Sequence, residues 1–97
     1  MQNLAQFIQL HRTEAGLTQD AFGALYGVSG PAIFKFERGY VNPSLDLWLS
    51  ISKDCGVPRD AAVLLWVQAK LPPEHRGLLD DLISEKFNGR RRRAHTA

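Results

Sequence analysis

The sequence has little of what several classes of protein require. Cys55 is its single cysteine, which excludes an internal disulfide, and its apolar helical surroundings predict a core position. The longest uninterrupted apolar run, residues 61–67, is too short to span a bilayer. The first ten residues lack the basic stretch and cleavage site of a signal peptide. We therefore expect a cytoplasmic protein with no membrane partner.

Motifs for catalysis and metal binding are also missing. The chain has no G-x-S-x-G motif, no P-loop and no paired-carboxylate motif. Its histidines, His11, His75 and His95, are far apart and show no ligand spacing with Cys55. We expect no enzymatic activity, no metal site and no cofactor.

Length and composition favour one soluble globular domain. Apolar residues make up 44% of the 97 residues and charged residues 23%, close to the averages of folded proteins. The net charge is +2, but four of the 12 cationic residues are Arg90 to Arg93, and the rest of the chain has more acids than cations. Residues 90–97 have no apolar period and predict a disordered basic tail, which either follows DNA or keeps the chain soluble.

The spacing of apolar residues predicts four short helices in the first 57 residues. Asn3 and Gln6 resemble a capping box, and Thr18, Ser29 and Ser44 are residue types that cap helix N-termini. Glycines stand where each helix should stop. The expected helices cover about residues 4–15, 19–26, 30–38 and 45–55.

The remaining chain has a different pattern. Residues 61–67 are apolar on every side, so a helix here needs packing partners on both sides. After Pro72 and Pro73, apolar residues recur at helical spacing as far as Gly89. We expect residues 58–89 to form two helices that join residues 1–57 in one compact unit.

Two short helices joined by a glycine-containing turn can place the second helix in the major groove of DNA. The chain has this arrangement between Thr18 and Arg38. Around it stand characteristic segments: Leu17 to Gln19, Gly27 to Ser29, Phe36 to Gly39, Asn42 to Ser44 and Cys55 to Val57. With these segments, residues 4–57 resemble the lambda-repressor-like (XRE, or Cro/C1-type) helix-turn-helix family. The resemblance implies an all-α bundle of four to five short helices plus an amphipathic C-terminal helix, with double-stranded DNA as partner.

The resemblance also implies roles for individual residues. Arg12 and Glu37 are expected to form a structural ion pair between the first and third helices. Bases are usually read by Arg, Lys, Gln or Asn, and the third helix has few polar side chains, so we expect it to discriminate few bases alone. The residues expected to contact phosphates or bases are Thr18, Gln19, Ser29, Gly30, Pro31, Ala32, Lys35, Arg38 and Tyr40.

Two residues of this region need a separate explanation. Gly23 stands where the family usually has alanine, and an interior glycine costs a helix about 1 kcal/mol relative to alanine. Close packing of the third helix on the second would explain it. Phe34 points, by helical spacing, away from the face of Ile33 and Phe36. It either covers the fourth helix, covers a neighbouring subunit, or is exposed.

One reading helix spans only a few base pairs, so proteins of this type generally dimerise on half-sites about 34 Å apart. We expect a homodimeric transcriptional regulator, a repressor that occupies a palindromic operator. The alternative is an antitoxin-like or scaffold protein whose C-terminal helices bind a partner protein such as a toxin. These helices either form the dimer contact or only complete the core. The residues expected in the dimer contact are Leu64, Leu65, Trp66, Leu78, Leu82 and Ile83.

Overall fold

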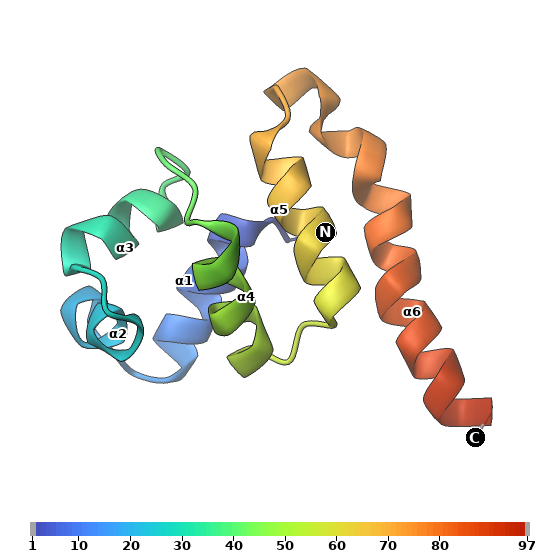
Figure 1. Ribbon diagram of the computed structural model, residues 1–97, viewed down its shortest axis with the longest axis horizontal. Helices are drawn as coiled ribbons and strands as arrows, with labels where there is room; N and C mark the ends of the chain where they lie inside the picture. The colour runs from blue at the N-terminus through green and yellow to red at the C-terminus, as the bar shows by residue number, and fades with distance from the viewer. Residues whose placement is uncertain (1, 97) are drawn as a thin grey trace.

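The structure is a computed structural model that describes the backbone of residues 2–96 and the side chains of residues 2–88. The described backbone contains helices and no strand, which confirms the all-α class. No helix in this part of the chain combines the length and the apolar character needed to cross a membrane. The helices are α1 (Leu4–Glu14), α2 (Gln19–Tyr26), α3 (Gly30–Glu37), α4 (Leu45–Asp54), α5 (Arg59–Lys70), the 3₁₀ helix η1 (Pro73–Leu79) and α6 (Asp80–Thr96) (Figure 1).

The first four helices begin where local chemistry predicts. The Asn3 side chain accepts a hydrogen bond from the N–H of Gln6, and the Gln6 side chain accepts one from the N–H of Asn3, both at 2.9 Å. Thr18, Ser29 and Ser44 cap α2, α3 and α4 by accepting from the N–H three residues later. Each cap satisfies a backbone donor that has no partner within its helix. The predicted helix starts are therefore confirmed.

One hydrophobic core joins all the α-helices. α2 and α3 lie at one side, α1 and α4 in the middle, and α5 and α6 run antiparallel at the other side (Figure 1). α5 packs between α4 and α6, which gives its apolar sequence cover on both sides. The indole N–H of Trp48 donates to the carbonyl of Ala62 at 2.7 Å and ties α4 to α5. The largest buried apolar side chains are Ile8, Phe22, Ile33, Trp48, Ile51, Leu65 and Ile83.

Two of the residues expected in a dimer contact are core residues instead. Leu65 and Ile83 are 0% exposed because α5 and α6 turn them toward the shared core. Side chains buried in this way cannot reach a second copy of the chain. Leu78 and Leu82, in contrast, are 75% and 38% exposed. The C-terminal helices therefore complete the core and also leave apolar side chains at the surface.

The last helix is longer than the sequence predicts. α6 extends to Thr96, whereas we expected it to end at Gly89. One interior glycine costs only about 1 kcal/mol, and arginine is a good helix former, so the helix can continue. The Phe87 ring stacks on Phe7 of α1 with centroids 6.3 Å apart, which fixes α6 on the body. The backbone of residues 90–96 belongs to α6 and not to the disordered tail that we expected, and the side chains of Arg90 to Arg93 lie outside the described residues.

Candidate nucleic-acid interface

α2 and α3 approach each other closely because each has a glycine where they meet, Gly23 in α2 and Gly30 at the start of α3. A Cβ added to Gly23 would lie 2.4 Å from the carbonyl oxygen of Val28. One added to Gly30 would lie 1.8 Å from a carboxylate oxygen of Asp20 and 3.1 Å from its backbone nitrogen. Gly23 thus has the packing reason that we expected. Gly30 is buried against α2, so it does not face outward as the sequence suggested.

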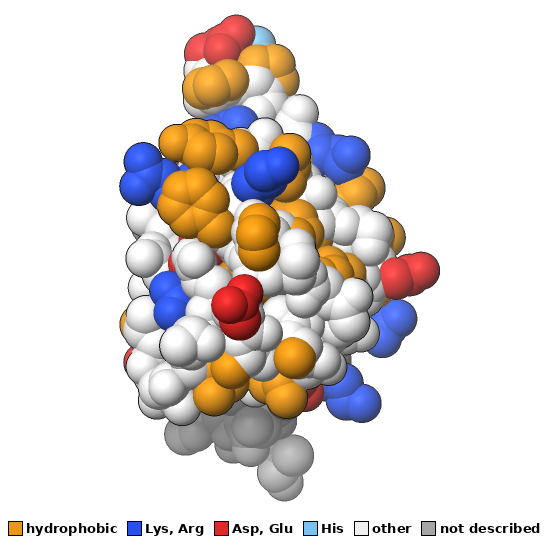
Figure 2. Space-filling model, turned by 90° about the vertical axis from the view of Figure 1, so that its left-hand side faces the viewer, with side chains coloured by type: hydrophobic (Ala, Val, Ile, Leu, Met, Phe, Trp, Pro, Cys, Tyr) orange, Lys and Arg blue, Asp and Glu red, His pale blue; other side chains and the backbone are white. Residues whose placement is uncertain are grey.

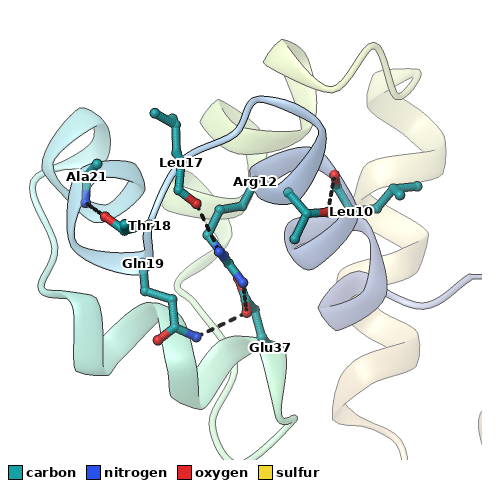
Figure 3. A network of polar contacts seen from close by, with 8 residues as sticks. Leu10, Arg12, Leu17, Thr18, Gln19, Ala21 and Glu37 are labelled. Atoms are coloured by element: carbon teal, nitrogen blue, oxygen red, sulfur yellow. Dashed lines mark hydrogen bonds and ion pairs between the residues drawn. The ribbon is translucent and has the colours of Figure 1, made fainter.

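Glu37, at the end of α3, joins three helices (Figure 3). Its carboxylate pairs with Arg12 of α1, with Nε–Oε2 at 2.6 Å and Nη2–Oε1 at 3.1 Å. The Arg12 Nη1 group also donates to the carbonyl of Leu17 at 2.9 Å. Gln19 of α2 donates from Nε2 to Glu37 Oε1 at 3.2 Å. The hydrogen bond and charge of Glu37 raise the pKa of Arg12, against the lowering effect of burial.

This network gives Gln19 a structural contact that its position in the sequence did not reveal. Gln19 is partly buried, and its amide group lies between the start of α2 and the end of α3 (Figure 3). A glutamine at a helix start shows no such partner in a linear pattern, because Glu37 is 18 residues away. The amide is therefore held in a fixed place at the edge of the α2–α3 surface.

The remaining predicted contact residues lie at different depths. The hydroxyl groups of Thr18 and Ser29 accept the cap hydrogen bonds of α2 and α3, although both residues are exposed. Ala32 is partly buried and packs against the core. The other exposed residues of the predicted set are Pro31, Lys35, Arg38 and Tyr40.

α3 presents one continuous face to solvent, which we call the α3 face. Its members are Pro31, Phe34, Lys35 and Arg38, all exposed and spaced i, i+3, i+4 and i+7. The opposite side of α3 carries the buried Ile33. α3 is thus supported from behind while its outer face stays accessible, which is the arrangement that a helix needs to enter a DNA groove.

An aromatic cluster extends the α3 face beyond the end of the helix. The rings of Phe34 and Tyr40 meet edge to face, with centroids 6.1 Å apart. The guanidinium carbon of Arg38 lies 5.8 Å from each ring centroid. Phe34 is 42% exposed and Tyr40 63%, so the cluster is a surface feature and Phe34 does not pack into the core. On this side of the molecule, hydrophobic side chains gather beside those of Lys and Arg (Figure 2).

Other kinds of site find little support among the described side chains. Burial, followed by the negative charges of Asp54 and Glu14, raises the pKa of Cys55 to about 11. At neutral pH Cys55 is therefore a thiol and a poor nucleophile. Within residues 2–88, no three or more His, Cys, Asp or Glu side chains gather in an arrangement that could hold a metal ion.

Comparison with known proteins gives one match. A family model described as helix-turn-helix, of the XRE or Cro/C1 type, matches residues 8–61, more than half of the chain. The match covers most of α1, all of α2, α3 and α4, and the first residues of α5. No curated protein and no solved structure matches the chain. Most of α5, and η1 and α6 entirely, lie outside the matched region.

Proposed function

Because the chain belongs to the XRE-type helix-turn-helix family, a family of DNA-binding regulatory domains, we propose that it is a sequence-specific transcriptional repressor. In this proposal the α3 face enters the major groove, and the protein acts in the cytoplasm on its own operator DNA. The observation that carries the proposal is the exposed α3 face, supported from behind by α2. A groove about 12 Å wide accepts one such helix.

The proposed DNA contacts are of two kinds: some read the bases, and others bind phosphates and position the protein on the duplex. Lys35, at the centre of the α3 face, is suited to the O6 and N7 acceptors of guanine. Arg38 and Tyr40 lie just beyond it, and Thr18 caps the N-terminus of the neighbouring helix α2. These side chains are suited to phosphate oxygens on either side of the groove, where contacts fix the register of the protein. Gln19 then adds a polar group at the edge of the same surface.

We also propose that two copies bind a palindromic operator, each with its α3 in one half-site. The support is the exposure of Leu78 and Leu82, four residues apart in the chain, since exposed apolar side chains that form one patch often mark an interface. Leu64 and Trp66 are only partly buried and can extend the contact. Light scattering at micromolar concentration tests the dimer. A mass near twice 10.9 kDa is expected, and a persistent monomer of 10.9 kDa contradicts it.

The same exposed side chains support a second candidate, an antitoxin-like or scaffold protein that binds a partner protein through its C-terminal helices. Leu78 is 75% exposed and lies outside the matched family region. A DNA-binding protein that is monomeric alone but forms a stable complex with a partner would favour this candidate. Substitution Leu78→Asp should then abolish the complex and leave DNA binding intact.

The test of DNA recognition is the selection of bound sequences from random duplexes at moderate salt. The wild type should enrich one motif, and Lys35→Ala should lose the preference at one position, about 1 to 3 kcal/mol of discrimination for a good base contact. Gln19→Ala should weaken binding to the same motif. Lys53→Ala, a change to an exposed lysine on α4, is the matched control and should enrich the wild-type motif. Absence of any enriched motif contradicts the proposal.

A further inference from the structure

The α3 face is unusual for a DNA-reading surface because two of its four residues, Pro31 and Phe34, are apolar. Pro31 and Phe34 are exposed, and Ala32 lies partly exposed beside them. Gly30, the first residue of α3, is buried against Asp20 and offers no side chain. The hydrogen-bond readers Asn, Gln and Arg are missing from α3 itself, whose sequence is GPAIFKFE. Direct reading by hydrogen bonds would then depend mainly on one cation, Lys35.

Phe34 is an apolar group on this face that contacts two neighbouring side chains. The edge-to-face contact with Tyr40 and the position of Arg38 near both rings restrict its side chain. An aromatic ring that is 42% exposed costs free energy unless a partner covers it. Phe34 is also next to Lys35 and one helical turn from Arg38, so a partner that covers it meets two positive charges. The fitting partner is anionic and carries small apolar groups.

Duplex DNA is such a partner, because its phosphates are anionic and its thymines carry a small apolar group. In the major groove the apolar group that the bases present is the C5-methyl of thymine, and apolar side chains such as alanine and phenylalanine recognise it by contact. We propose that Phe34, together with Ala32 and Pro31, recognises C5-methyl groups of pyrimidines in the operator. This inference rests on the proposed function, since it assumes that the α3 face enters the major groove. It makes Phe34 a specificity-determining residue.

The test compares selections from two random duplex pools, one made with thymidine and one with deoxyuridine, which lacks the C5-methyl group. The thymidine pool should give a motif with required thymines, and the deoxyuridine pool should lose the preference at those positions. Duplexes with single deoxyuridine replacements should bind about fourfold more weakly for each contacted methyl group, the value of burying one such group.

The outcomes separate the inference from the proposed function. Identical motifs and equal affinities in both pools overturn methyl recognition and leave sequence-specific DNA binding intact. No motif in either pool defeats the proposed function, and methyl recognition fails with it.

A set of variants assigns the effect to Phe34. Phe34→Ala should bring the ratio of thymidine to deoxyuridine affinity below that of the wild type, because only Ala32 and Pro31 then remain to contact methyl groups, and the helical content should be unchanged. Phe34→Leu, which keeps an apolar side chain, should retain a ratio above that of Phe34→Ala. Leu10→Ala is the matched control, because Leu10 is 40% exposed and lies on α1, away from the α3 face. A full wild-type ratio in Phe34→Ala overturns the role of Phe34.

Discussion

Glu37 shows how one side chain can set the relative positions of three helices. Its carboxylate is 4% exposed and receives hydrogen bonds from Arg12 and Gln19. Arg12 is 15% exposed and also donates to Leu17, so most of its hydrogen-bonding capacity is used inside the protein. A partly buried charge that loses its partner is costly because water replaces only part of the lost interaction. The position of the α3 face therefore depends on the pair of Arg12 and Glu37.

Glu37→Gln should destabilise the protein strongly. The change leaves the charge of the partly buried Arg12 without a counter-charge, and hydrogen bonds to charged groups are worth about 1.5 to 3 kcal/mol. The free energy of unfolding in urea measures the loss. Glu74→Gln, at an exposed glutamate of η1, is the control and should change the stability by less than about 0.5 kcal/mol. A loss under about 1 kcal/mol for Glu37→Gln is inconsistent with a stabilising role.

The raised pKa of Cys55 should make the free energy of unfolding of the protein depend on pH in the alkaline range. Burial raises its pKa from 9.0 to about 11, so between these values the unfolded chain releases a proton that the folded protein keeps. The free energy of unfolding should be unaffected by this group below pH 9 and should fall as the pH rises toward 11. Urea unfolding from pH 7 to 11 measures the fall. Cys55→Ala should reduce it, and an equal fall in the variant excludes Cys55 as its source.

Among the helices, it is the packing of α3 on α2 that sets the position of the α3 face in the proposed interface. It is close because Gly23 leaves no Cβ between α2 and the carbonyl of Val28. That carbonyl belongs to the turn, and backbone in a tight turn cannot move aside as a flexible side chain can. The residue that lowers the helix propensity of α2 is thus the one that allows α3 to pack.

Gly23→Ala should therefore destabilise the protein, although alanine is the better helix former. The gain in propensity of about 1 kcal/mol opposes a contact of 2.4 Å with the Val28 oxygen, and forced overpacking typically costs about 1 to 3 kcal/mol. Thermal melting should show a lower midpoint. The control is Gly77→Ala, where the nearest atom to the new Cβ is 3.8 Å away and the midpoint should stay or rise. A higher midpoint for Gly23→Ala is the contrary result.

The helices could be predicted from the sequence because their signals are local. Thr18, Ser29 and Ser44 cap the helices that follow them within three residues, and apolar spacing marks the core faces. The burial of Leu65 and Ile83 could not be predicted with the same certainty, because it depends on how α5 and α6 meet. An apolar residue fits a core and an interface equally well in a linear pattern.

The sequence predicts where in the chain the candidate site lies, but not all of the contacts that its residues make. The helix pair and its turn follow from residues 18–38, but three contacts depend on tertiary packing. Gly30 is buried by Asp20, and Gln19 donates to Glu37 of another helix. The aromatic cluster forms because the chain turns back after α3 and brings Tyr40 to the ring of Phe34. Helical spacing alone left three alternatives open for Phe34.

At the scale of the whole molecule, the two ends of the body present different surfaces. At the side of α2 and α3, the α3 face and Tyr40 combine cationic and aromatic side chains, and hydrophobic side chains lie there beside those of Lys and Arg (Figure 2). η1 and the start of α6, at the other side, expose Leu78 and Leu82 (Figure 1). The shared core connects the two, since Leu65 and Ile83 lie in the same cluster as Ile33 of α3. The proposed DNA contact therefore lies on the first side, and the proposed contact with protein lies on the second.

The most direct test of this assignment follows backbone amide chemical shifts of ¹⁵N-labelled protein during titration with a selected duplex. We predict saturable shifts that are largest at the start of α2, along α3 and in residues 38–42. Amides of η1, which carries Leu78, should change little when the oligomeric state is constant. Largest shifts on η1 and α6, or no amide that shifts saturably with the duplex, would contradict DNA binding by the α3 face.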